Sequence, residues 1–577
     1  MITPRRLAVT PPVALLVAFA ALVACAAASS APIAVAATPV EGAVRAARTL
    51  SAALAPTAAF APVDCAEFGY AWEIAPDEAV CGDVTVPLHH ADPRGPTITL
   101  AVAVVHRSAG ASDGAGGAAT SSIANARDAA PLILLQGGPG ASTIDAFFDL
   151  ALAAPTDRSG LAGIREQRDL VLLDQRGTRY GQPALMCPEL VDLTRKTIEL
   201  DLDPDVYFAL EDDAVADCRD ALDGQGIDIA AFNSLENAAD IPSVAQALGY
   251  DRFSVYGVSY GSLLALHLMR QQPPGLESVV LDGVVPPPID FNQEAPASLN
   301  GSLSALFDAC AAAPDCKAAY PNLEATLRDT LDRLDDHPAR VPVIDPATGI
   351  RYRALVDGRS LLDAVHQLLY GGPDLPIVPR MIDAAARGND GALGEIMGSY
   401  AFDDSLAEGM YMSTVCSEDG DINPDAVPLD RIRPWLADRL SGDADDILAG
   451  CDIWDVPALP APIDAPVVSD VPTLLMSGRF DPITPPAFAE ATARTLSHAQ
   501  RVVFPAGGHG ALGDPCSNAL VAAFLADPTA KLDTACAADP AAPDFRTPAD
   551  TFFSPVPRTM LRLFDLLVPV GDEPPEA

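Results

Sequence analysis

A serine held between glycines has the clearest chemical potential in this chain. The motif Gly-Val-Ser-Tyr-Gly at 257–261 follows a strand-like run, 253–257, and precedes a helix-like run, 262–270. In that context the spacing predicts a sharp turn that exposes the serine hydroxyl, with glycine where larger side chains would collide. We therefore predict that Ser259 is a nucleophile.

A serine hydroxyl attacks only when a base takes its proton, so a histidine and an orienting acid are expected downstream. His509 follows an apolar run and lies in a loop flanked by glycines, 507–510. Asp481 comes just after the apolar run 473–477 and is the predicted acid. Asp282, also at the end of a strand-like run, is the alternative acid.

Acyl transfer also needs N–H donors for the negative oxygen that forms during the reaction. The sequence Gln-Gly-Gly-Pro-Gly at 136–140 follows the apolar run 131–135. One donor usually comes from such a loop and the other from the residue after the nucleophile. Gly138 and Tyr260 are the predicted donors.

The elements that must position these residues alternate between strands and helices. Short apolar runs rich in Val, Ile and Leu are typical of parallel strands buried on both faces. They occur at 98–106, 131–136, 170–174, 253–257, 278–282, 473–477 and 501–505. Helix-like segments such as 238–248 separate them, which indicates an α/β fold with a mostly parallel central sheet flanked by helices.

The middle of the chain changes character. Helical patterns replace the strand series between about 286 and 459, with Leu323, Leu327, Leu331 and Leu334 on one helix face. We predict a mostly helical cap insertion at 286–459 that divides the sheet domain into 63–285 and 460–577.

The N-terminal region has the features of an export signal. Arg5 and Arg6 precede a short apolar run, which predicts a signal peptide at 1–24. The run ends at Cys25 in a pattern like a bacterial lipobox, so lipidation of Cys25 is expected, with cleavage near 36 without lipidation as the alternative. The Ala/Pro/Ser-rich stretch 25–62 is predicted to be a flexible tether.

Ten of the 11 cysteines remain after Cys25, an even number that suits disulfides in an exported protein. Sequence alone leaves many pairings open, but the cysteines fall into neighbouring couples and we predict that these couples pair. They are Cys65–Cys81, Cys187–Cys218, Cys310–Cys316, Cys416–Cys451 and Cys516–Cys536. Their spacing does not indicate a metal site, and no metal or cofactor is expected.

Composition limits the partners. With 36 basic and 78 acidic residues the formal net charge is −42, which repels polyphosphate and excludes nucleic acid as a partner. Because 49% of the residues are hydrophobic, the chain must bury a large core.

The motifs in order resemble those of the prolyl aminopeptidase and tripeptidyl aminopeptidase family. The resemblance covers about 63–545 and includes Gly-Arg-Phe-Asp-Pro-Ile-Thr-Pro at 478–485 and a C-terminal segment of the tripeptidyl type from His509. It implies an α/β-hydrolase fold and an exported serine exopeptidase that releases a single residue, proline, or a di- or tripeptide from the N-terminus of peptides. It also makes Glu418, with Asp419 beside it, the expected anchor for the free amine of the substrate.

Two other functions remain open. An esterase or lipase would share the catalytic residues but need an apolar acyl groove. A noncatalytic binding protein on the same fold would normally lack one of the three residues, whereas Ser259, Asp481 and His509 are all present.

Overall fold

The computed structural model describes residues 58–70, 74–108, 129–154, 157, 160–389, 391–440, 442–538 and 543–548. The predicted signal peptide and Cys25 lie outside these residues, as does the predicted tether up to residue 57. Residues 60–62, predicted as the end of the tether, instead belong to a strand that pairs with the edge of the sheet.

A nine-stranded sheet forms the centre of the structure, in the order β1-β2-β3-β5-β4-β6-β7-β10-β11. The strands are β1 (Phe60–Val63), β2 (Ala79–Pro87), β3 (Thr97–Val105), β4 (Leu132–Leu135), β5 (Leu170–Leu173), β6 (Phe253–Val258), β7 (Leu276–Asp282), β10 (Thr473–Gly478) and β11 (Ala499–Phe504). From β5 to β11 all neighbours are parallel, whereas β1, β2 and β3 pair antiparallel and β3 joins β5 antiparallel. The predicted apolar runs are strands of this sheet.

Helices cover both faces of the sheet, which explains why its central strands are apolar at every position. In β4, Ile133 and Leu135 enter one core, while Leu132 and Leu134 enter the core on the opposite face. The first face carries α7 (Ser234–Ala247), α8 (Tyr260–Gln271) and α18 (Pro486–Ala493). The second carries α3 (Thr143–Leu152), α4 (Ala162–Arg165) and α19 (Pro515–Ala526).

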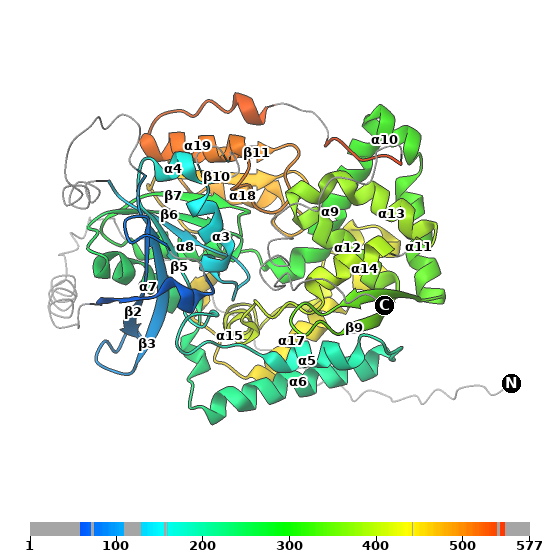
Figure 1. The fold of residues 1–577 in the computed structure, drawn as a ribbon, viewed down its shortest axis with the longest axis horizontal. Coiled ribbons are helices and arrows are strands. Elements are labelled where there is room, and N and C mark those ends of the chain that lie inside the picture. The colour runs from blue at the N-terminus through cyan, green and yellow to red at the C-terminus, as the bar shows by residue number, and fades with distance from the viewer. Residues whose placement is uncertain are drawn as a thin grey trace, which may run out of the picture. The chain divides into compact units, whose positions relative to one another are not determined.

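A helical part with its own core lies between β7 and β10 in the sequence and beside the sheet in space (Figure 1). Its helices are α9 (Phe291–Ala312), α10 (Pro314–Ala319), α11 (Leu323–Asp336), α12 (Gly358–Tyr370), α13 (Val378–Ala386), α14 (Gly391–Tyr400), α15 (Glu408–Glu418), α16 (Pro434–Leu440) and α17 (Asp443–Trp454). The predicted leucine stripe of α11 is buried. The sequence analysis missed a two-stranded antiparallel hairpin in this part, β8 (Ala339–Ile344) and β9 (Arg351–Val356).

The helical part also includes two helices that precede the predicted insertion in the sequence. Helices α5 (Pro188–Thr197) and α6 (Pro204–Gly224) follow β5, and they run alongside α17 and below α15 in Figure 1. Arg219 of α6 donates a hydrogen bond to the Trp454 carbonyl oxygen at 2.9 Å. The helical wall beside the sheet is thus built from two separate stretches of sequence.

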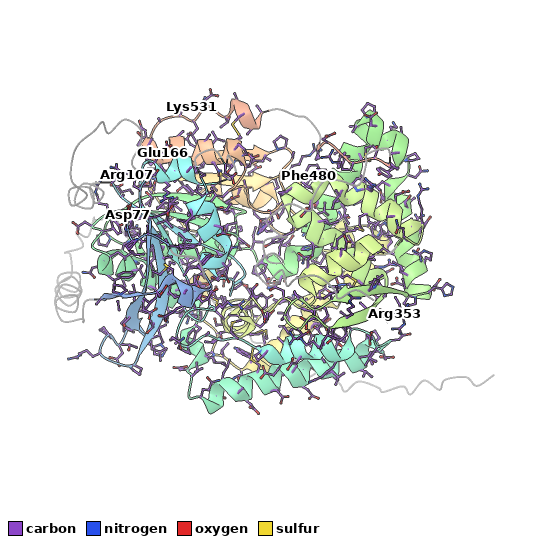
Figure 2. The ribbon with its side chains drawn as sticks, in the orientation of Figure 1. Asp77, Arg107, Glu166, Arg353, Phe480 and Lys531 are labelled. Atoms are coloured by element: carbon purple, nitrogen blue, oxygen red, sulfur yellow. A yellow bond between two sulfur atoms is a disulfide. The ribbon has the colours of Figure 1, made fainter. Side chains whose placement is uncertain are left out.

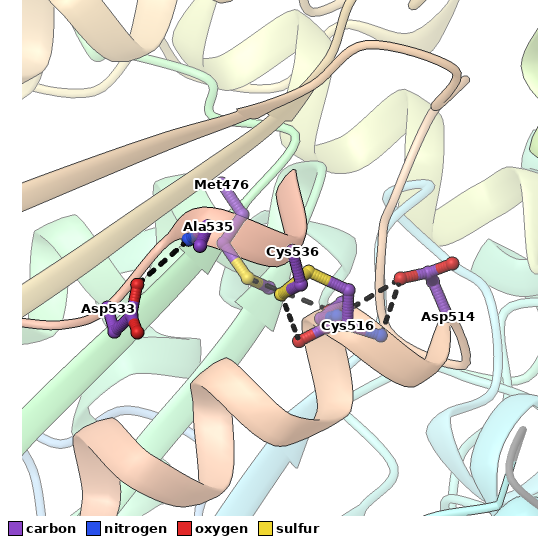
Figure 3. Close-up of a disulfide and its surroundings, with 7 residues drawn as sticks. Met476, Asp514, Cys516, Asp533, Ala535 and Cys536 are labelled. Atoms are coloured by element: carbon purple, nitrogen blue, oxygen red, sulfur yellow. Dashed lines mark hydrogen bonds between the residues drawn. A yellow bond between two sulfur atoms is a disulfide. The ribbon is translucent and has the colours of Figure 1, made fainter. Parts of the chain in front are cut away.

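Five disulfides join the neighbouring couples that the sequence predicts. They are Cys65–Cys81, Cys187–Cys218, Cys310–Cys316, Cys416–Cys451 and Cys516–Cys536. The last one ties the start of α19 to residues near the end of the described chain, and Asp514 caps the same helix by accepting from the backbone N–H of Cys516 (Figure 3). Within the described residues, no helix has the length and apolar character needed to cross a bilayer.

Candidate active site

Ser259 occupies a strained turn between β6 and α8. Its φ of 56° and ψ of −125° lie in a region that side chains rarely adopt, and the residue is 9% exposed. A Cβ atom on Gly257 would lie 2.1 Å from the Gly261 carbonyl oxygen, and one on Gly261 would lie 2.3 Å from the Leu135 carbonyl oxygen. Glycine is therefore required on both sides of the serine.

His509 and Asp481 form a buried pair at the ends of β11 and β10. The Nδ1 atom of His509 lies 2.9 Å from Oδ2 of Asp481, which orients the ring and leaves Nε2 free to act as a base. Thr484 donates from its hydroxyl to the same carboxylate oxygen at 2.6 Å, and its Oγ1 lies 2.9 Å from His509 Nδ1.

The surroundings of Asp481 favour its charged form. Burial alone would raise its pKa, but the attraction of His509 and the hydrogen bonds from His509 and Thr484 outweigh burial and hold the pKa below its usual range. An ionised Asp481 is what a triad needs, because it stabilises the imidazolium that forms when His509 takes a proton.

Asp282, the alternative acid, has a different role in the structure. It accepts hydrogen bonds from the Tyr256 hydroxyl at 2.7 Å and from the backbone N–H groups of Ala511 and Leu512 at 2.7 and 3.1 Å. It therefore anchors the loop just after His509, while Asp481 holds the His509 ring.

Tyr370, which the sequence analysis did not identify, reaches the site from the helical part. It is the last residue of α12, and its ring centroid lies 4.3 Å from that of His509. Burial raises the pKa of Tyr370, against a smaller lowering by the side chain of Ser259, and the Tyr370 carbonyl oxygen accepts from the His509 backbone N–H at 2.8 Å. The buried Nε2 atom of His509 has no hydrogen-bond partner among the described residues, so the Ser259 hydroxyl is not hydrogen-bonded to it in this state.

Phe480 gives the helical part a second connection to the site. It precedes Asp481 directly, and its fully buried ring belongs to the core of the helical part (labelled in Figure 2). Ser302 of α9 donates a hydrogen bond to the Phe480 carbonyl oxygen. Asp481 is thus held in place both by the end of β10 and by contacts of the adjacent Phe480 with the helical part.

The glycine loop lies directly against the nucleophile. A Cβ atom on Gly137 would lie 2.6 Å from Ser259 Cβ and 3.0 Å from its Oγ. Gln175 supports the loop by donating to the Gln136 carbonyl oxygen at 2.7 Å. Tyr260 follows Ser259 as the first residue of α8, and Gly138, with a φ of 109°, follows Gly137 in the loop; their role as N–H donors stays a prediction.

Glu418 and Asp419, at the end of α15, lie behind Tyr260. Glu418 accepts hydrogen bonds from the backbone N–H and the hydroxyl of Ser234, both at 2.8 Å, and the Ser234 hydroxyl lies 2.9 Å from the Tyr260 hydroxyl. Burial raises the pKa of Glu418 to about 7. Burial and the nearby Asp290 raise the pKa of Asp419.

Both carboxylates line a cavity of about 10 Å³, roughly the space of one water-sized group. Their predicted role in amine binding remains a prediction.

Among the described residues, no group of three or more His, Cys, Asp or Glu side chains is arranged to hold a metal ion.

Comparisons with known proteins agree with this architecture. Residues 130–317 match the model of the alpha/beta hydrolase fold family, and residues 441–536 match that of the TAP-like protein family. Serine protease Hip1 of Mycobacterium tuberculosis is 24% identical over 481 residues, covering 78% of this chain and 85% of that protein. Hip1 of Mycobacterium bovis matches to the same extent.

Solved structures that match the chain share less sequence with it. A proline iminopeptidase from Mycobacterium smegmatis is 17% identical with a TM-score of 0.35, and the match covers 78% of this chain and 98% of that one. The esterase RhEst1 from a Rhodococcus species is 14% identical with a TM-score of 0.32, over 74% of this chain and 95% of the other.

The sheet order, the serine turn and the family matches define the chain as an α/β-hydrolase. Its C-terminal part is similar to TAP-like proteins, and 78% of the chain is similar to serine protease Hip1.

Proposed function

We propose that the chain is an exported serine exopeptidase that releases short N-terminal pieces from peptides: a single residue, proline, or a di- or tripeptide. The observation that carries the proposal is the strained serine turn beside the His509–Asp481 pair, whose Nδ1–Oδ2 distance is 2.9 Å. The TAP-like match and the likeness to Hip1, a serine protease by name, favour peptides as substrates over esters.

In the proposed reaction, Ser259 Oγ bonds to the carbonyl carbon of the scissile peptide while His509 Nε2 takes the hydroxyl proton. The carbonyl oxygen becomes negative and is received by the backbone N–H groups of Tyr260 and Gly138. The C–N bond then breaks, and His509 gives its proton to the leaving amine. A water molecule releases the acyl group in the same way, with His509 taking its proton and Ser259 Oγ leaving.

Recognition of the free amine is proposed at Glu418 and Asp419. Asp419 is surrounded by other carboxylates, including Asp290 and Asp464, so a positive group placed there would relieve repulsion. The small cavity beside both residues suits the head of an ammonium group. Glu418→Gln should then raise KM for free-amine peptides and leave a nitrophenyl ester almost unaffected, whereas equal losses would point to damage at Tyr260.

Export is the second part of the proposal. Five disulfides support an oxidising compartment, and Cys25 is the proposed site of lipidation, which would attach the protein to the cell envelope. Mass spectrometry of protein from the native envelope should find Cys25 at the N-terminus with attached lipid. An unmodified N-terminus beyond residue 25 would mean ordinary secretion instead.

A substrate panel tests the activity. Purified protein is assayed with peptide amides that have a free N-terminus, with the same amides acetylated, and with nitrophenyl esters, and Ser259→Ala serves as the control. An exopeptidase prefers the free-amine amides. A preference for esters with little amide hydrolysis would favour the esterase, and no hydrolysis of any substrate would favour a binding protein.

A further inference from the structure

A cleft of about 600 Å³ lies in the helical part, outside the candidate catalytic residues. It is lined by residues of α5, α6, α15, α17 and the segment 401–408. Its apolar lining includes Met186, Leu190, Val215, Met412 and Ile447. Its volume falls in the range of about 300–1,000 Å³ that is common for ligand pockets.

The charged side chains that line the cleft are almost all acidic. The carboxylates are Glu211, Asp212, Asp403, Asp404, Glu408 and Asp446. Arg179 is the only basic residue among the described residues of the lining, and its NH1 atom lies 3.6 Å from Asp404 in an exposed pair. The cleft therefore combines an apolar floor with a strong excess of negative charge.

Glu408 is the acid that most needs a partner. It begins α15, and its carboxylate has no hydrogen-bond or ion-pair partner among the described residues. Burial raises its pKa to about 7, and the nearby Asp403 and Glu211 add to the rise. Glu211, on α6, likewise has its pKa raised by burial, then by Asp446 and Asp212. A positively charged ligand would offset the cost of burying these two carboxylates and would reduce the repulsion between them and the neighbouring acids.

Aromatic side chains strengthen the case for a cation. Tyr207, Phe208 and Tyr411 line the cleft, and Phe208 is 39% exposed. The faces of aromatic rings attract ammonium and guanidinium groups. An aliphatic stem would pack on the apolar floor, so the lining fits a charged group carried on a hydrocarbon chain.

The cleft wall is continuous with the glycine loop of the active site. The Leu406 side chain lines the cleft, and its Cδ1 lies 3.2 Å from where a Cβ of Gly138 would be. The backbone N–H of Ala407 donates to the Gly140 carbonyl oxygen at 3.0 Å. A group bound in the cleft is therefore close to the loop that lies against Ser259.

We propose that this cleft is a specificity subsite for a lysine or arginine side chain of the peptide substrate, with Glu408 and Glu211 as its anionic partners. The inference rests on the proposed peptidase function. It is distinct from amine recognition at Glu418 and Asp419, which lie outside the lining of this cleft.

Binding to the Ser259→Ala variant tests the subsite without hydrolysis. Calorimetry compares pairs of peptides that differ only by lysine or norleucine at one position, with the position moved along the peptide. We expect one position at which lysine binds at least tenfold more tightly than norleucine. Equal affinities at every position would overturn the proposal, and activity on the substrate panel would then leave the peptidase function standing.

Two further experiments test whether the lysine preference arises in this cleft. Glu408→Gln and Glu211→Gln, each in the Ser259→Ala background, should reduce the lysine preference severalfold, whereas Asp213→Asn should not, because Asp213 is an exposed acid of α6 outside the cleft lining. If neither glutamine variant changes the preference for lysine over norleucine, the assignment of this cleft as the subsite is contradicted. The preference should also persist in N-acetylated peptides, and its loss on acetylation would show that the cleft binds the terminal amine instead of a side chain.

Discussion

The phenol ring of Tyr370 lies 4.3 Å from the imidazole ring of His509, centroid to centroid, and the Tyr370 carbonyl oxygen accepts a hydrogen bond from the His509 backbone N–H. A residue of the helical part thus contacts the predicted base of the site directly. Because Tyr370 ends α12, the position of that helix controls how the two residues meet.

Substitutions of Tyr370 should separate the role of its ring from that of its hydroxyl. Tyr370→Phe keeps the ring against His509 and removes only the hydroxyl, so kcat/KM should stay within about tenfold of the parent. Tyr370→Ala also removes the packing that orients His509, and we expect a loss at least tenfold larger. Similar kcat/KM values for both variants, at equal thermal stability, would show that the ring does not position His509.

Asp481→Asn should remove most activity and leave the fold intact. The amide cannot stabilise the imidazolium of His509, and a loss of about 10³–10⁴-fold in kcat is typical of this change in a triad. Steady-state kinetics together with circular dichroism would measure it. Asp282→Asn is the comparison: it should lower stability through the loop after His509, and a larger catalytic loss from Asp282→Asn than from Asp481→Asn would reverse the assignment.

Gly137→Ala should displace the nucleophile. The added Cβ would lie 2.6 Å from Ser259 Cβ, so the loop or the serine must shift, and misplacement of about 1 Å costs roughly a hundredfold in rate. Gly163→Ala is a matched control, because a Cβ there meets nothing within 4 Å. If kcat/KM of Gly137→Ala equals that of the control, the loop does not approach the nucleophile as closely as the structure indicates.

Glu418 should make stability depend on pH. Its pKa is raised by burial from an ordinary value of 4.5 to about 7 in the folded protein. A raised carboxyl pKa means that the folded state binds the proton more tightly, so this contribution is present below about pH 4.5 and is lost as the pH rises through about 7.

Denaturant unfolding at pH 5 and pH 8 measures this effect. The parent should lose more unfolding free energy between these pH values than Glu418→Gln, by about 1 kcal/mol or more. The same pH dependence in both proteins would mean that Glu418 titrates near its ordinary value.

The sequence predicted the parts of the site that depend on local pattern. Ser259 and Asp481 each follow a buried strand and His509 follows the partly exposed edge strand β11, and parallel strands carry the loops at their carboxyl ends to one edge of the sheet. The spacing of the glycines predicted the turn at 257–261, because the need for glycine there arises from residues close in the sequence.

What the sequence did not predict depends on packing between distant segments. Tyr370 has no local signature, because its role comes from the docking of α12 against the His509 loop. The cleft needs α6 to pack beside α17, which lies more than two hundred residues further along the chain. Short alternating strands such as β8, with Pro342 inside it, were hidden within a mainly helical region.

The most direct test of the central claim is to identify the residue that becomes covalently modified. The protein is treated with a fluorophosphonate, which phosphonylates activated serines, and the adduct is mapped by peptide mass spectrometry, with Ser259→Ala and His509→Ala as controls. The account predicts a single adduct on Ser259, loss of amide hydrolysis in proportion to labelling, and no adduct in Ser259→Ala. An adduct on another residue, or amide hydrolysis that continues after Ser259 is fully modified, would contradict it.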